Sequence, residues 1–242
     1  MKPRAFITGG GSKFGKYTVD CLIKDGYKVD NISSKKHPKA NTAKVNWNEL
    51  NYGIAKDALN QFKEGPVYDY IIFNANNIYH FWEEEYANSD ETVHRKWKQS
   101  FFTNIELTNI VLTELKNRIS KHTIVVTLLS GIVSREGNGR DYFKSKAGAM
   151  QDKYAGYTAM KTSAYFLMQG FHAHLEGSYI CLDPGHMQTE HDYKIKSNKF
   201  YKKLKRLKNK FKIYNFIPFG LFNLEQGDAV KTMTWKEIIN KK

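Results

Sequence analysis

A tyrosine and a lysine stand four residues apart between Gly156 and Ala164, as Tyr157 and Lys161. On a helix, residues i and i+4 lie on the same face, so this spacing predicts a phenol beside an ammonium. A neighbouring positive charge favours the phenolate and lowers the tyrosine pKa from its usual value of about 10. Such a tyrosine can give a proton to a carbonyl oxygen or take one from an alcohol. The pair therefore predicts acid–base chemistry on oxygen.

The same spacing occurs a second time, in Tyr142 and Lys146. One such pair alone is compatible with an ordinary surface contact, because the chain holds 15 tyrosines and many lysines. The surrounding segments distinguish the two pairs. An amphipathic helical pattern, a strand and a Pro184-Gly185 turn follow Tyr157, whereas glycines and charged residues follow Tyr142. We therefore favour Tyr157.

The N-terminal segment has the pattern of a strand, a glycine-rich turn and a helix. Residues 4–7 predict a buried strand, residues 8–15 read Thr-Gly-Gly-Gly-Ser-Lys-Phe-Gly, and residues 16–25 form an amphipathic run that ends at Gly26. This order lets backbone N–H groups and a helix N-terminus meet a pyrophosphate. A plain glycine turn is the alternative.

A second strand, predicted at residues 27–32, ends in Ser33, Ser34, Lys35 and Lys36. In dinucleotide-binding folds an acidic side chain at this point holds the ribose hydroxyls of NAD. Hydroxyl groups and positive charge suit a 2'-phosphate instead, so we expect NADP rather than NAD. A solvated basic turn is the alternative.

The rest of the chain continues to alternate between apolar strands and helices. Further strands are predicted at residues 42–47, 68–73, 123–129 and 178–182, and helices at 51–62, in part of 80–97, at 97–119 and at 157–174. Continuous apolar strands separated by helices predict a parallel sheet covered on both faces. We expect one domain over residues 1–242, a three-layer α/β/α doubly wound sheet, with a polar insertion at 133–153 and a basic lid-like segment at 190–215.

The bulk properties exclude several classes of protein. A chain of 242 residues with 41% hydrophobic and 14% aromatic residues is not disordered. No stretch has the length of a membrane span or the apolar core of a signal peptide, so we expect a soluble, cytoplasmic protein. Cys21 and Cys181 have no metal-site spacing and suggest no disulfide framework. The net charge of +14 indicates an attraction to anions.

The order of these motifs resembles the short-chain dehydrogenase/reductase family, of the single-domain kind, over residues 4–190. Residues 8–15 are similar to its Thr-Gly-x-x-x-Gly-x-Gly loop, except that Lys13 replaces the middle glycine. Residues 73–76, Phe-Asn-Ala-Asn, are similar to its Asn-Asn-Ala-Gly segment. Asn104, Ser130 and the Tyr157 and Lys161 pair match its active-site residues, and Pro184-Gly185 with Thr189 is similar to its Pro-Gly-x-x-x-Thr turn.

The resemblance implies hydride transfer between NADP and a carbonyl or alcohol. It implies that Tyr157 is the general acid or base, and that Lys161 holds the tyrosine pKa down and binds the nicotinamide ribose. It also implies that Ser130 polarises the substrate oxygen and that Asn104 positions a water. Ser134 and Ser145 are lesser candidates for the serine. The implied cofactor-binding residues are Gly9, Gly11, Ser12, Lys13, Phe14, Gly15, Ser33, Ser34, Lys35, Asn74, Ala75, Asn76, Tyr157, Lys161, Pro184, Gly185, Met187 and Thr189. A catalytically inactive dinucleotide-binding sensor or scaffold is the alternative, motivated by Lys13 and the incomplete Asn-Ala-Asn match.

Residues 194–212 hold ten basic residues and no acidic one, with Phe200, Leu204, Leu207 and Phe211 at helical spacing. This basic amphipathic pattern is compatible with a lid that recruits an acidic substrate, with contact to an anionic membrane, with nucleic-acid contact, or with a solvated helix docked on the core. We expect no nucleic-acid partner. The resemblance favours a homodimer through the helices that contain Asn104 and Tyr157, and the family's last strand is expected to be missing or very short.

Overall fold

The computed structural model describes residues 2–75, 90–128, 151–183 and 231–234, with side chains at 2–12, 14–75, 95–128 and 160–181. Its centre is a seven-stranded parallel sheet in the order β3-β2-β1-β4-β5-β6-β7. The strands are β1 (Arg4–Thr8), β2 (Lys28–Ser33), β3 (Asn41–Lys44), β4 (Tyr70–Phe73), β5 (Ile124–Leu128), β6 (Ser178–Asp183) and β7 (Lys231–Thr234). The chain runs outward from β1 to β3 and then returns to β4, so the strand order reverses between β1 and β4. Ligands of open α/β sheets bind at such a reversal, at the carboxyl ends of the strands.

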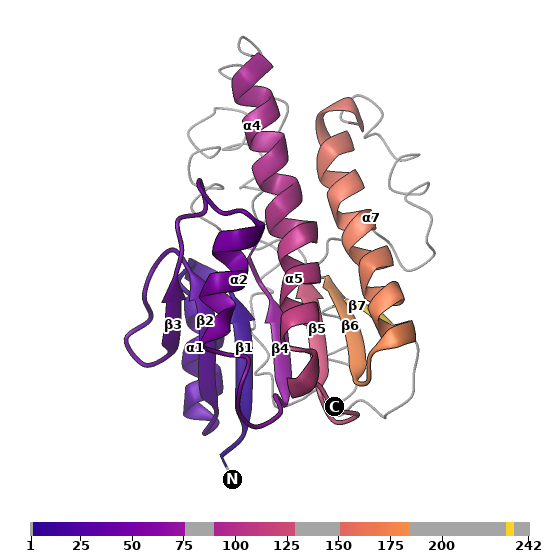
Figure 1. Cartoon of the computed structure of the whole chain (residues 1–242). Helices are drawn as coiled ribbons and strands as arrows, with labels where there is room; N and C mark the ends of the chain where they lie inside the picture. Colours follow the sequence, from indigo (N-terminus) through magenta and orange to yellow (C-terminus); the bar gives the residue numbers. More distant parts are fainter. Residues whose placement is uncertain (1, 76–89, 129–150, 184–230, 235–242) are drawn as a thin grey trace, which may run out of the picture.

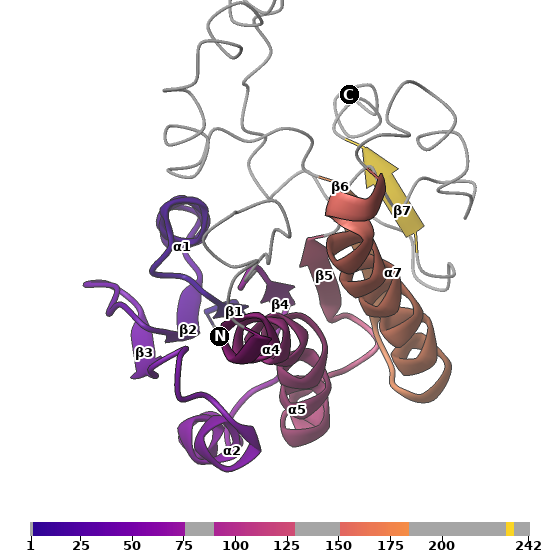
Figure 2. The same ribbon diagram turned by 90° about the horizontal axis from the view of Figure 1, so that it is seen from above.

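Helices cover both faces of this sheet (Figures 1 and 2). Among the described residues, one face carries α1 (Lys13–Lys24), and the other carries α2 (Tyr52–Asn60), α4 (Asp90–Phe101), α5 (Leu107–Glu114) and α7 (Gln151–His174). Successive strand residues pack into opposite cores: Ile7, Ile72 and Val126 face α1, whereas Phe6, Ile71 and Val125 face the other layer. The predicted doubly wound α/β fold is confirmed. Within the described part of the chain, no helix is both long and apolar enough to cross a bilayer.

Several helices begin or end at other residues than predicted. The first helix begins at Lys13 rather than at residue 16, because the Ser12 side chain caps it by accepting a hydrogen bond from the Gly15 N–H. The long helix predicted at 97–119 begins at Asp90, ends at Glu114 and is interrupted by a π-helical turn over Phe102–Glu106. Residues 151–153 of the predicted insertion belong to α7.

Residues 133–150 of the predicted polar insertion, and the whole of the predicted basic segment at 190–215, lie outside the described residues. The last strand, expected to be missing or very short, is present as the four residues of β7.

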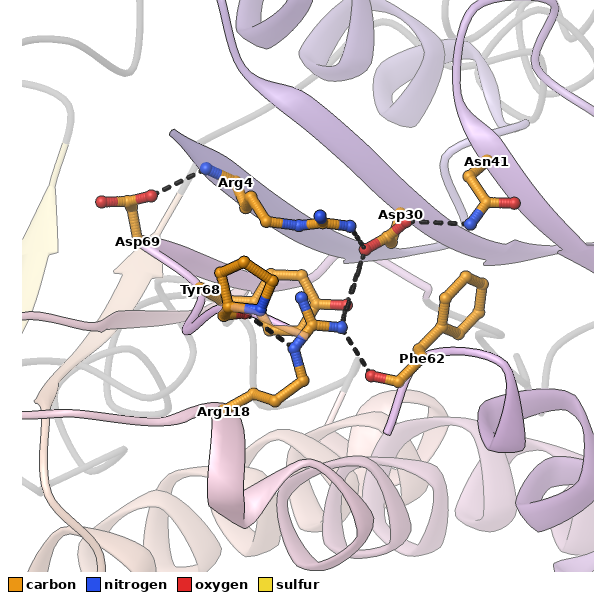
Figure 3. A network of polar contacts seen from close by, with 8 residues as sticks. Arg4, Asp30, Asn41, Phe62, Tyr68, Asp69 and Arg118 are labelled. Atoms are coloured by element: carbon orange, nitrogen blue, oxygen red, sulfur yellow. Dashed lines mark hydrogen bonds and ion pairs between the residues drawn. The ribbon is translucent and has the colours of Figure 1, made fainter. Parts of the chain in front are cut away.

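A buried polar network ties β2 to the loops at the amino edge of the sheet (Figure 3). Oδ2 of Asp30 accepts hydrogen bonds from Nη2 of Arg4 at 2.9 Å and from the Tyr68 hydroxyl at 2.7 Å. That hydroxyl accepts a hydrogen bond from Nη1 of Arg118 at 2.6 Å, and the Arg118 guanidinium lies 3.7 Å from the centre of the Tyr68 ring. Burial, and then the charge of Asp30, raises the pKa of Tyr68 above its usual range. The phenol therefore stays a donor to Asp30.

Arg118 depends on this arrangement because its side chain is almost completely buried. Its Nε donates to the Pro66 carbonyl at 2.8 Å, and its Nη1 also donates to the Phe62 carbonyl at 2.6 Å. Asp30 is the carboxylate nearest to it, with Oδ2 3.9 Å from Nη1. The network thus joins β1, β2 and the connections from α2 to β4 and from α5 to β5 around one buried negative charge.

We predict that Asp30→Ala lowers the free energy of unfolding by about 3–5 kcal/mol, because it leaves the buried Arg118 cation without a counter-charge. Urea unfolding of the wild type and the variant measures the difference. Glu114→Ala is the matched control. It removes ion pairs to Lys56 and Lys63 that are partly exposed, and should change the free energy by about 1 kcal/mol or less. Equal effects of the two substitutions would contradict the role given to Asp30.

Candidate active site at the carboxyl edge

The amide groups of the glycine loop are held by residues at the end of β2. The Gly9 N–H donates to the Ile32 carbonyl at 2.8 Å, the Gly10 N–H to Oδ1 of Asn31 at 2.9 Å, and the Gly11 N–H to Oγ of Ser33 at 3.0 Å. The loop also closes on itself, since the Ser12 N–H donates to the Gly9 carbonyl. Because these amides have partners within the protein, a bound phosphate would meet the first turn of α1 rather than the loop amides. That turn carries no acidic residue.

Asn74 and Ala75, which follow β4, hold the other side of the loop. Nδ2 of Asn74 donates to the Gly9 carbonyl at 3.0 Å and to Oγ of Ser12 at 3.2 Å, and the Ala75 N–H donates to Oγ1 of Thr8 at 3.0 Å. A Cβ at Gly15 would lie 2.2 Å from the Gly9 carbonyl oxygen. Only glycine fits at position 15, so the last glycine of the motif is required for the helix to begin this close to the loop.

The end of β2 presents a buried hydroxyl and then exposed lysines. Ser33 is 2% exposed, and its Oγ accepts hydrogen bonds from the N–H groups of Gly11 and Lys35. Ser34 is half-buried, whereas Lys35 and Lys36 are exposed. Ser33 therefore anchors the glycine loop, and the positive charge beside that loop comes from the lysines.

Asn104 lies in the π-helical turn between α4 and α5. The Leu107 N–H bonds to the Phe102 carbonyl, five residues back, which widens the helix at this point. The Asn104 side chain is buried; its Nδ2 donates to the Ser100 carbonyl at 2.8 Å, and its Oδ1 lies 3.5 Å from Nζ of Lys161. Single π turns often occur at functional sites. Here the turn places the asparagine beside the lysine of α7.

Lys161 is a buried cation at the carboxyl end of β5. Its side chain is 2% exposed, and Nζ donates to the carbonyl of Leu128, the last residue of β5, at 2.8 Å. Burial disfavours the ammonium and lowers the pKa of Lys161 to about 7. A lysine in this state can exchange a proton near neutral pH, and perturbed values of this kind are typical of active sites.

Several predicted site residues lie outside the described part of the chain. They are Ser130, Asn76, Pro184, Gly185, Met187 and Thr189, together with the lesser serine candidates Ser134 and Ser145. The backbone of Tyr157 belongs to α7, one turn before Lys161, and that of Lys13 begins α1, but the side chains of both lie outside the description. Among the described residues, no group of three or more His, Cys, Asp or Glu side chains could hold a metal ion.

The fold agrees with solved structures of other proteins. The chain is similar to a short-chain dehydrogenase family protein from Francisella tularensis, with 17% identity and a TM-score of 0.60, over 87% of this chain and 77% of that one. It is also similar to the aldohexose dehydrogenase of Thermoplasma acidophilum, with 14% identity, a TM-score of 0.63, and coverage of 86% and 76%. The chain has the short-chain dehydrogenase/reductase fold. A third structure with this fold, a short-chain dehydrogenase from Shigella flexneri complexed with NADP, has 13% identity and a TM-score of 0.63 over 83% of this chain and 84% of that one. No protein-family model and no curated protein matches the sequence.

Within this short-chain dehydrogenase/reductase fold, the structure brings together residues from five parts of the chain. The glycine loop, the β2 end and Asn74 form one group, and Asn104 with Lys161 forms a second group at the same edge of the sheet. Sequence reasoning missed Asn31 and the Leu128 carbonyl, and it gave Thr8 only as part of the loop motif. Asn31 carries a signal, since it is a polar residue inside a strand that is otherwise predicted to be buried. The Leu128 carbonyl carries none, because any residue could supply it.

We predict that Lys161→Met raises the free energy of unfolding of the cofactor-free protein at pH 7 by about 2–4 kcal/mol. The unfolded lysine, with a pKa of 10.5, binds a proton that the folded one with a pKa of about 7 releases, so wild-type stability rises with pH through this window. The advantage of the variant should therefore shrink as the pH rises towards 10.5. Urea unfolding at several pH values measures it, and Lys24→Met on the exposed end of α1 is the control. A variant less stable than the wild type at pH 7 would contradict the predicted penalty.

Proposed function

We propose that the protein is an NADP-dependent oxidoreductase that transfers a hydride between nicotinamide and a carbonyl or alcohol substrate, with Tyr157 as general acid or base. The observation that carries the proposal is Lys161, buried at the end of β5 beside Asn104 and four residues after a tyrosine of the same helix. The short-chain dehydrogenase/reductase fold supports the reaction class. The substrate is a small carbonyl or alcohol compound, and the basic segment 194–212 favours an acidic one; contact of that segment with an anionic membrane surface is a second proposal.

The residues present fit a dinucleotide. The glycine loop and the start of α1 lie at the reversal of strand order, where the helix dipole favours a pyrophosphate. Ser34 and Lys35 follow the end of β2 and suit a 2'-phosphate better than two free ribose hydroxyls, which supports NADP over NAD. Lys13, at the first position of α1, would add positive charge in place of the family's glycine.

Bound NADP would supply the hydride, and the protein would supply the proton and the orientation. In reduction, Tyr157 would donate its proton to the substrate oxygen, and in oxidation it would accept one. When protonated, Lys161 would favour the phenolate of Tyr157. Because its pKa lies near 7, Lys161 would also return a proton to Tyr157 at neutral pH, from the side on which Asn104 lies. Ser130 would hydrogen-bond to the substrate oxygen as negative charge develops on it.

We predict that Tyr157→Phe lowers the reductase rate by roughly 100-fold or more, because general acid catalysis is lost, while NADPH binding is retained. The rate is followed by NADPH absorbance with a panel of aldehydes and ketones, and binding by nicotinamide fluorescence. Tyr165→Phe is the control on the same helix; it removes only the hydroxyl that accepts a hydrogen bond from Gln169 and should keep the rate.

The outcomes separate the alternatives. Full activity of Tyr157→Phe, with loss of activity in Tyr142→Phe, would assign the acid to Tyr142. If the wild type binds NADPH and turns over no substrate in the panel, the result favours the alternative of a dinucleotide-binding sensor or scaffold. If it binds neither NADPH nor NADH, the proposed function is wrong.

We also propose a homodimer through the layer of α4, α5 and α7. Three aromatic side chains in the described part of this layer are exposed: Trp97 at 37%, Phe101 at 43% and Phe166 at 66%. Gly170, one turn after Phe166, has open space where a Cβ would stand, which allows a second helix to approach closely. Exposed aromatic residues of this kind are enriched in protein interfaces.

We predict that Phe166→Glu converts the dimer to a monomer, because a carboxylate would be buried in the interface without a partner. Light scattering after size-exclusion chromatography measures the mass. Tyr52→Glu, a similarly exposed position on α2, is the control and should leave the dimer intact. A monomeric wild type, or a dimer that survives Phe166→Glu, would exclude this interface.

A further inference from the structure

We propose that His37 is a positioning residue for NADP selection, and that it holds the loop of residues 34–40 so that its lysines meet the 2'-phosphate. The proposal rests on the proposed function and adds a residue to it. Lys35, Lys36 and Lys39 are exposed in this loop, whereas His37 between them is 2% exposed. A histidine buried inside a run of exposed lysines indicates that the loop has a defined shape.

His37 is fixed from three sides. Its Nδ1 accepts a hydrogen bond from the Lys39 N–H at 3.2 Å, so the side chain closes a tight turn over its own loop. Its backbone N–H donates to Oγ1 of Thr42 in β3 at 3.4 Å. Its Nε2 lies 3.3 Å from Oδ1 of Asp20 in α1, without the alignment of a hydrogen bond. Asp20 is 49% exposed, so this contact contributes little by itself and the turn carries most of the constraint.

Two connections join this loop to the glycine loop. Oγ of Ser33 accepts from the N–H groups of both Gly11 and Lys35, at 3.0 and 3.4 Å. A Cβ at Gly11 would lie 2.5 Å from the Lys35 carbonyl oxygen, so the two backbones are in contact. The basic loop therefore begins directly beside the predicted pyrophosphate site.

The second connection runs through Asn31 and Thr42. Nδ2 of Asn31 donates to Oγ1 of Thr42 at 3.3 Å, and Oδ1 of Asn31 accepts from the Gly10 N–H. The same Thr42 hydroxyl oxygen accepts from the His37 N–H. His37 is thus joined through two side chains to the glycine loop. Lysines on a loop ordered in advance lose less conformational entropy on binding a phosphate.

The test uses adenosine 2',5'-bisphosphate and adenosine 5'-monophosphate as probes, with binding measured by calorimetry at fixed ionic strength. The wild type should bind the bisphosphate more tightly. His37→Ala should weaken bisphosphate binding about tenfold, which corresponds to 1.4 kcal/mol, and change monophosphate binding by about twofold or less. His37→Asn should restore most of the preference, because an asparagine side chain can accept from the N–H two residues on in the same way. Asp20→Ala should have a small effect.

The ratio of the two dissociation constants decides the outcome. If His37→Ala weakens both probes equally, or His37→Asn is as impaired as His37→Ala, His37 does not position the 2'-phosphate site and the inference is overturned. If His37→Ala does not fold, Thr42→Val replaces it, and an unchanged ratio in that variant has the same meaning. A wild type without preference for the bisphosphate also overturns the inference. NADH binding by that same protein would leave the oxidoreductase proposal standing, whereas binding of neither NADH nor NADPH would refute the proposed function itself.

Discussion

Hydrogen bonds to the glycine loop shape the carboxyl edge of the sheet. Gly9 and Gly10 are buried, and an unpaired buried N–H group costs about 1–3 kcal/mol. Asn31 and Ser33 of β2 accept from the Gly10 and Gly11 N–H groups, and Asn74 after β4 donates to the Gly9 carbonyl. The same three residues fix where α1 begins and how the loop after β2 leaves the sheet. The geometry available to a phosphate follows from these contacts.

Lys161, unlike the loop amides, is buried at a net cost in free energy. Its burial is unfavourable for the charged amine, and the Leu128 carbonyl and Asn104 offset only part of that penalty. The penalty persists because the helix is held in place by other residues: Ala164 and Met168 of α7 lie in the core against the sheet. A site whose strain is maintained by packing elsewhere is typical of a chemical role rather than of a structural one.

Local signals in the sequence predicted most of this fold. Strand and helix periods, and the order of the motifs, predicted six strands of the parallel sheet and the edge at which Asn104 and Lys161 meet, but not β7. Features that depend on contacts between distant segments were not predicted. Asn104, in the π turn, lies beside a lysine of α7 that is 57 residues away, and the side-chain partners of Arg118 are 50 or more residues away in the chain. The Ser12 cap was a readable signal, and it was missed because the glycines around it suggested a loop.

The amino half of β2 contributes to stability, whereas its carboxyl end leads into the loop proposed to select the cofactor. Asp30 is the only acidic residue of that strand, and Arg4, Tyr68 and Asn41 all bond to its carboxylate in the amino half of the sheet. The Asp30 carboxylate is therefore bonded within the core. It lies three residues before the end of the strand, and an acid would have to stand at that end to hold the ribose hydroxyls of NAD. At that end Ser33 is occupied by backbone amides. Under the proposed function, discrimination between NADP and NAD falls to the loop that follows, and we propose that His37 shapes that loop.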